Sequence, residues 1–163
     1  MSKDLPDANI FIQAKNLHYG FDFCPAFWEW LDTMNTEGKV ASIERVKDEL
    51  HTIEDELSEW ANGKDKGFFL PADEYVIPRL SEVSNWASQQ TYEAAAIAGF
   101  LQVADYYLVA HAKAYGCIIV THEVPSDSIR KIKIPNACIG LGITCVTPYE
   151  MLRRERAKFV LSK

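Results

Sequence analysis

The sequence predicts an α/β protein, a three-layer α/β/α sandwich around a short central parallel sheet. Residues 117–121 and 143–146 are continuous apolar stretches of strand length, a pattern typical of parallel strands that are buried on both faces. Amphipathic helical patterns alternate with these stretches, as they do in α/β folds. The length of 163 residues suits a single domain covering residues 1–163.

Helical patterns fill the first half of the chain. Pro25 stands at a first helical position, and the helix that it opens ends at Gly38. A second helix is expected from Ser42, because apolar residues recur every three or four positions up to residue 60. Glycines within residues 62–67 then indicate a charged surface loop.

In the second half of the chain, the sequence predicts further helices around the two strands. Residues 78–88 form one helical pattern. Thr91 caps a long alanine-rich segment that is expected to form two helices meeting near Asp105, and Gly116 ends it. After the second strand, Pro148 opens a final helix that carries a basic cluster.

Composition and charge narrow the function classes. A net charge of −6 argues against broad, non-specific nucleic-acid binding, but residues 121–163 hold eight Lys or Arg against four Asp or Glu. The four cysteines form no close-spaced pair, which favours free thiols over a zinc site. No apolar run approaches the ~20 residues of a membrane span, and no signal core opens the chain. We therefore expect a cytoplasmic protein.

Four acidic residues in different local contexts carry the functional argument: Asp7, Glu49, Asp105 and Glu123. Asp7 follows a first strand if residues 3–6 form one, and Glu123 lies just past strand 117–121, where parallel sheets bind ligands. Asp105 interrupts an apolar run, a costly setting for a carboxylate that is neither paired nor bound to a cation. If the four acids converge, they form the oxygen-rich site that Mg²⁺ or Mn²⁺ prefers.

Each acid also has a structural explanation. Asp7 is a candidate turn cap, Asp105 a candidate helix N-cap and Glu123 an ordinary loop acid. Glu49 borders the apolar face of its helix, and Glu54 borders the other edge by a similar angle. Helical geometry alone therefore does not choose between these two glutamates.

The chain resembles the PIN-domain ribonucleases of the VapC-like type, and within them the PIN-like group described as domain of unknown function DUF4411. The resemblance rests on the order and spacing of residues 7–12, 48–50, 104–112, 120–123 and 133–154. The sequence departs from the family pattern at two of the acids. Pro6 interrupts the expected first strand before Asp7, and Glu123 replaces the usual Asp.

The resemblance implies a metal-dependent endoribonuclease that hydrolyses RNA phosphodiester bonds. It implies that one or two Mg²⁺ or Mn²⁺ ions are bound by the same acids that carry catalysis, namely Asp7, Glu49, Asp105 and Glu123. Two further residues are expected to hydrogen-bond these carboxylates, Asn9 and Thr121. Three basic residues are expected to hold the RNA backbone, Arg130, Lys131 and Lys133.

The resemblance also implies partners. Many such proteins are toxins held inactive by an antitoxin, and the aromatic stretch 21–28 is a candidate surface for an antitoxin or a homodimer, although core packing also explains it. Two alternatives stay open: a DNA- or structure-specific nuclease, and a catalytically silent module that binds RNA or protein. His111 and His122 are more simply explained as structural residues than as general acids.

Overall fold

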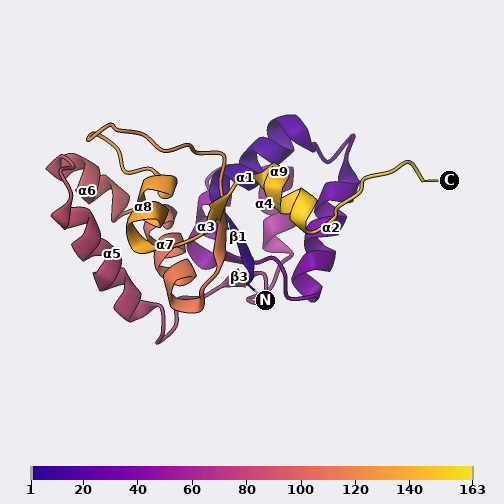
Figure 1. Cartoon of the computed structure of the whole chain (residues 1–163). Helices are drawn as coiled ribbons and strands as arrows, with labels where there is room; N and C mark the ends of the chain where they lie inside the picture. The colour runs from indigo at the N-terminus through magenta and orange to yellow at the C-terminus, as the bar shows by residue number, and fades with distance from the viewer. Residues whose placement is uncertain (1, 163) are drawn as a thin grey trace.

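A parallel sheet of three short strands lies at the centre of the computed structural model, which describes residues 2–162 (Figure 1). Its strand order is β1-β4-β5, and a second parallel pair, β2-β3, adjoins it through a bridge between Asp4 and Val40. The strands are β1 (Asp4–Pro6), β2 (Ser42–Ile43), β3 (Phe69–Leu70), β4 (Ile118–Val120) and β5 (Cys145–Val146).

Helices cover the sheet on two sides, so the expected α/β/α arrangement around a short parallel sheet is confirmed. Figure 1 shows α5 to α8 on one side and α1, α2, α4 and α9 on the other. The helical elements are α1 (Ala8–Gln13), the π-helical turn η1 (Ala14–His18), α2 (Pro25–Thr36), α3 (Glu44–Leu50), α4 (Glu56–Asn62), α5 (Ile77–Gln89), α6 (Ala94–Phe100), α7 (Ala104–Tyr115), α8 (Ile134–Leu141) and α9 (Pro148–Arg154). Within residues 2–162, no helix is both long and apolar enough to cross a membrane.

Strand β1 forms despite its proline. The backbone of Asp4 bonds on the side away from β4, donating to Lys39 and accepting from Ala41. Because backbone groups alternate sides along a strand, the nitrogen of Pro6 also faces away from β4, and no ladder hydrogen bond to β4 is lost. The carbonyl of Pro6 accepts a 2.8 Å hydrogen bond from the Ser42 hydroxyl. The expected first strand is therefore present and forms one edge of the three-stranded sheet.

The expected single helix from residue 42 to 60 is wrong. Residues 42–43 form β2, α3 ends at Leu50, and α4 begins only after Asp55. Asp55 and Ser58 form a reciprocal capping box that starts α4. Ile53, which continues the apolar periodicity, is 67% exposed in the intervening turn.

Helix α7 packs beside the central sheet. Its middle residues Leu108, Val109 and Ala110 are fully buried, and the helix packs against both β4 and α5. It ends at Gly116, which adopts the left-handed conformation (φ 67°) expected of a helix stop. The residue that caps its neighbour α6 is Glu93 rather than the expected Thr91. Because α7 packs against β4, its first turn holds Asp105 beside the sheet.

The aromatic side chains of the first half of the chain divide between the core and the surface. Trp28 is 3% exposed within the core, and Trp60 packs edge-on against it with ring centroids 4.9 Å apart. In the aromatic stretch 21–28, Phe27 is buried but Phe23 is 65% exposed. None of the four cysteines forms a disulfide within residues 2–162; Cys117 and Cys138 are buried, and Cys24 and Cys145 are half-buried.

Candidate active site

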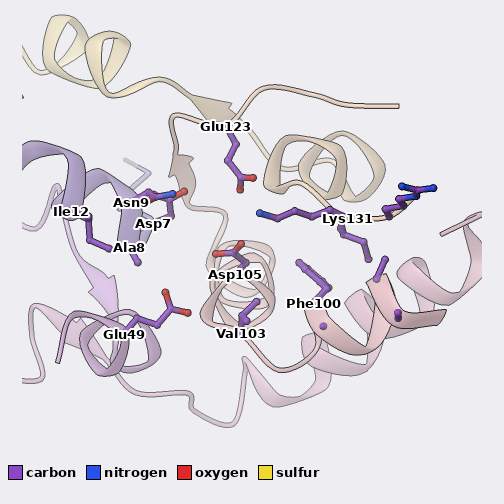
Figure 2. A pocket seen from close by; sticks show the side chains of 15 residues that line it. Asp7, Ala8, Asn9, Ile12, Glu49, Phe100, Val103, Asp105, Glu123 and Lys131 are labelled. Carbon is purple, nitrogen blue, oxygen red and sulfur yellow. The ribbon is translucent and has the colours of Figure 1, made fainter. Parts of the chain in front are cut away.

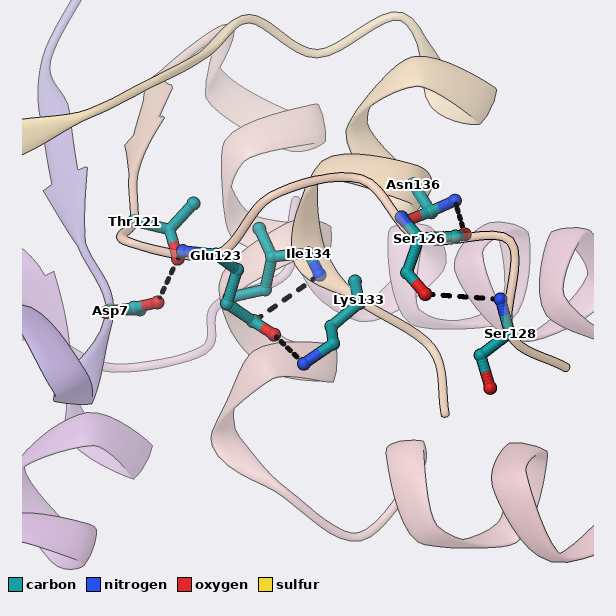
Figure 3. Close-up of polar contacts among 8 residues, drawn as sticks. All are labelled: Asp7, Thr121, Glu123, Ser126, Ser128, Lys133, Ile134 and Asn136. Carbon is teal, nitrogen blue, oxygen red and sulfur yellow. Dashed lines mark hydrogen bonds and ion pairs between the residues drawn. The ribbon is translucent and has the colours of Figure 1, made fainter. Parts of the chain in front are cut away.

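Asp7 stands where β1 passes into α1. Its backbone N–H donates to Val120 at 3.0 Å, which fixes the aspartate beside the end of β4. One carboxylate oxygen accepts from the N–H of Ile10 at 3.0 Å, so Asp7 is the N-cap of α1. The other accepts from the Thr121 hydroxyl at 2.5 Å (Figure 3). Asp7 thus caps a helix, which agrees with the structural role expected of it, and it also lines the cavity described below.

Glu49 reaches the same region from the side of α3. Its carboxylate accepts from the N–H of Ala104 at 3.1 Å, at the start of α7. Glu54 lies beyond the end of α3 and is exposed to solvent. The break after Leu50 therefore separates two glutamates that a continuous helix would have left equivalent.

Asp105 occupies the first turn of α7, but Val103 is the N-cap residue. The N-cap explanation of this aspartate is therefore wrong. Within residues 2–162, its carboxylate has neither a hydrogen-bond partner nor an ion pair. Burial, and then the nearby carboxylates of the other three acids, raise the pKa of Asp105 to about 7, while Lys131 opposes the rise. A cation bound beside this carboxylate would favour its charged form and oppose the rise.

Glu123 follows β4 and contacts the start of α8. Its N–H donates to the Thr121 hydroxyl at 3.1 Å. One carboxylate oxygen lies 3.5 Å from the N–H of Ile134, and the other lies 3.5 Å from Lys133 Nζ (Figure 3). Thr121 therefore links two of the acids, since its hydroxyl donates to Asp7 and accepts from Glu123.

The four carboxylates face one cavity of about 360 Å³, which we call the acid cavity. Figure 2 shows their side chains pointing into it from four different segments of the chain. Part of its apolar lining comes from α6 and the segment after it, including Phe100 and Val103, which sequence reasoning did not single out. Of the residues expected to assist, Asn9, Arg130 and Lys131 also line the cavity.

Three of the four acids share a mode of support. Asp7, Glu49 and Glu123 each accept from an N–H group at the start of a helix, namely α1, α7 and α8. The unpaired N–H groups and partial positive charge at a helix start favour a nearby anion. This arrangement lets several carboxylates stay close together in a partly buried cavity.

The donor set suits a hard divalent ion, because it consists of carboxylate oxygens with one carboxylate left without partners. However, no group of three or more His, Cys, Asp or Glu side chains in the described part of the chain is placed to hold a metal ion. Glu123 is also paired with Lys133, whose Nζ lies 3.5 Å from its carboxylate. The residues fit Mg²⁺ or Mn²⁺ in kind, and a complete coordination shell requires side-chain movement.

The histidines lie outside the acid cavity. His111 is 4% exposed and lines a different cavity with Lys3 and Tyr115. His122 packs against the ring of His18, with centroids 5.6 Å apart. Neither is positioned to act as a general acid on a substrate in the acid cavity.

Comparisons with known proteins gave one family match and two structural matches. The family described as domain of unknown function DUF4411 matches residues 5–159. A search of the curated proteins found no match. The structure of FitAcB from Neisseria gonorrhoeae is similar at a TM-score of 0.54 and 18% identity, covering 90% of this chain and 98% of that one. The structure of FitAB bound to an IR36 DNA fragment gives a TM-score of 0.55 and 18% identity, covering 90% and 95%.

The two structural matches establish a common PIN-like fold, since they extend over nearly the full length of both chains. The family match extends over the strands and helices that carry all four acids. This chain is therefore a member of the DUF4411 family with a PIN-like fold.

Proposed function

We propose that this protein is a metal-dependent nuclease that hydrolyses phosphodiester bonds in RNA. The observation that supports it most strongly is the convergence of four carboxylates on one cavity with basic residues at its rim. The likeness to PIN-domain ribonucleases and the PIN-like fold point the same way.

Asp7, Asp105 and Glu123 would hold Mg²⁺ or Mn²⁺, with Glu49 as a further ligand or a partner through water. When bound, the ion would supply an activated water nucleophile and would offset negative charge on the leaving oxygen. The side chains at the site have separate tasks. Thr121 fixes the orientation of Asp7 through its hydroxyl, and the N–H of Ala104 holds Glu49.

The rim gives a reason for an RNA substrate to approach an acidic protein. Arg130 is 85% exposed at its side chain, lines the cavity and pairs only loosely with Glu93 at 4.0 Å. Lys131 reaches toward the carboxylates (Figure 2). These cations would attract the phosphate backbone toward the four acids. Asn9, exposed at the cavity wall, would contact a carboxylate or the substrate.

We further propose that the protein is the toxin of a toxin–antitoxin pair. This rests on the resemblance to VapC-like proteins and on the fold shared with FitAB, one structure of which is bound to DNA. An antitoxin encoded alongside would then be its partner. Co-expression of the neighbouring reading frame should suppress any growth defect that the wild type causes.

A second candidate is a silent PIN-like module that binds RNA without cleaving it. The pairing of Glu123 with Lys133 and the incomplete coordination shell favour this alternative. A nuclease that prefers DNA is the third possibility, and substrate comparison separates it from the first.

Cleavage assays on single-stranded RNA and DNA with Mn²⁺ test the proposal. The wild type should cleave RNA, and either EDTA or Asp105→Asn should abolish cleavage. Asp4→Asn is a matched control, because Asp4 is another buried aspartate that does not line the acid cavity. Cleavage that survives both EDTA and Asp105→Asn would exclude the metal site as its source. Binding of RNA without cleavage by the wild type would favour the silent module.

A further inference from the structure

Lys133 occupies a position between the acid cavity and the start of α8. Its Nζ lies 3.5 Å from Glu123, and the two side chains are 32% and 14% exposed. This pair is less hydrated than a typical surface ion pair. It engages one oxygen of Glu123, while the N–H of Ile134 engages the other.

The backbone that carries Lys133 is well fixed. Asn136 holds the loop from both sides, accepting from Ser126 N–H at 3.0 Å and donating to Ser126 carbonyl at 2.8 Å (Figure 3). Ile129 carbonyl accepts from Glu93 N–H at 2.9 Å, and Ile132 is 3% exposed. The Lys133 side chain therefore starts from a defined point next to Glu123.

The pair fixes one of the four acids, Glu123, and leaves the other three untouched. Glu123 is held against α8, while Asp105 lacks any hydrogen-bond partner among residues 2–162. No trio of acids in that part of the chain is placed to hold an ion. A divalent ion that uses Glu123 must compete with the ammonium group, because both neutralise the same carboxylate.

We propose that Lys133 is a positioning residue of the acid cavity, which holds Glu123 in the metal-free protein and releases it when a divalent ion binds. This inference rests on the proposed function, since it requires that the four acids bind such an ion. It assigns Lys133 a role distinct from that of Arg130 and Lys131, which line the acid cavity without pairing with Glu123. Lys133 would thereby set the ion concentration at which the site assembles.

Calorimetric titration with Mn²⁺ gives the first test. Lys133→Met keeps most of the aliphatic stem and removes the charge, so Mn²⁺ should bind about three- to five-fold more tightly, the order expected for a partly exposed ion pair. Lys133→Arg keeps the pair and should stay within about two-fold of the wild type. Arg130→Met removes a charge at the rim without touching Glu123, and its effect should be smaller than that of Lys133→Met.

Side-chain NMR of ¹⁵N-lysine-labelled protein gives a readout that is independent of activity. Adding Mg²⁺ should shift or broaden the Lys133 ammonium signal as its ion pair breaks, and Asp105→Asn should abolish this response. If the wild type binds Mn²⁺ but Lys133→Met has unchanged affinity and the ammonium signal does not respond, this inference is wrong and the proposed function stands. If the wild type binds neither ion, the metal site fails and the inference fails with it.

Discussion

Asp4 begins the first strand and Asp7 directly follows its end, and both are buried, at 0% and 3% exposed. Burial raises the pKa of each from 3.8 to about 6. Their surroundings differ. Neither carboxylate oxygen of Asp4 has a hydrogen-bond partner in the described residues, and its ion pair with Arg154 is 3.8 Å long. Asp7 accepts two hydrogen bonds and faces the acid cavity.

The comparison shows that a raised pKa marks burial and is not sufficient to mark a functional site. Perturbed carboxyl groups are often used to find active sites, yet here the same shift occurs at both positions. What separates Asp7 from Asp4 is an open cavity shared with three other carboxylates. A functional role is therefore expected only for Asp7, and variants at the two positions should behave differently.

The largest difference is expected in RNA cleavage. Asp7→Asn should lower the rate by at least about 100-fold, because it removes a carboxylate that would bind the ion directly. Mutation of a residue that only supports a metal ligand typically lowers metal affinity or activity by about 10- to 100-fold. Asp4→Asn should stay within about two-fold. Circular dichroism and gel filtration should show that both variants are folded. Equal losses in two folded variants would remove the distinction drawn between these aspartates.

Unfolding free energies measured over a pH series should show how the buried carboxyl groups of Asp4 and Asp105 affect stability. Burial raises the pKa of Asp4 and Asp105, to about 6 and about 7, so each holds its proton to higher pH in the folded state than when unfolded. Between pH 4 and pH 7 the folded state thus binds more protons, and these groups lower stability as pH rises. The free energy of unfolding of Asp105→Asn and of Asp4→Asn, each relative to the wild type, should therefore rise from pH 4 to pH 8 by on the order of 2 kcal/mol.

Added Mg²⁺ should change the stability difference between Asp105→Asn and the wild type, but not that between Asp4→Asn and the wild type. With Mg²⁺ at pH 8, the wild type should be stabilised by ion binding and the relative gain of Asp105→Asn should shrink. The gain of Asp4→Asn should be unchanged, since both it and the wild type keep the acid cavity intact. Urea unfolding in matched buffers with and without Mg²⁺ measures this, and a Mg²⁺ response that Asp105→Asn retains in full would count against the site.

A smaller effect is expected at Thr121, which supports two acids without being one. Thr121→Val keeps the shape and removes the hydroxyl that bonds Asp7 and the Glu123 N–H. Cleavage should fall about 10-fold, and stability should fall by about 1–3 kcal/mol because buried partners lose their hydrogen bonds. Cleavage rates at saturating Mn²⁺ check the first part. An unchanged rate would mean that the orientation of Asp7 does not depend on this hydroxyl.

Sequence patterns predicted the elements where a local signal was unambiguous. Pro25 and Gly116 marked a helix start and a helix end that the structure contains. The periodicity from residue 43 to 60 misled, because apolar spacing continued through a turn that leaves Ile53 exposed. The Asp55 and Ser58 capping signal was present in the sequence and marks the true start of α4.

The candidate site was predictable only in part. Asp105 and Glu123 stood out through an apolar setting and a strand end, both of which are local features. The choice of Glu49 over Glu54 depends on where α3 ends, and angles on an ideal helix do not contain that information. The contact of Lys133 with Glu123 depends on the course of the loop 121–133, which Asn136 holds and which no periodicity encodes.

Calorimetric titration of Mn²⁺ at pH 7.5 into the wild type, Asp105→Asn and Asp4→Asn tests the central claim most directly. We expect saturable binding to the wild type, the same binding to Asp4→Asn, and loss of binding in a folded Asp105→Asn variant. Absence of binding to the wild type, or equal binding to all three proteins, would contradict the claim that the four converging carboxylates form a metal site.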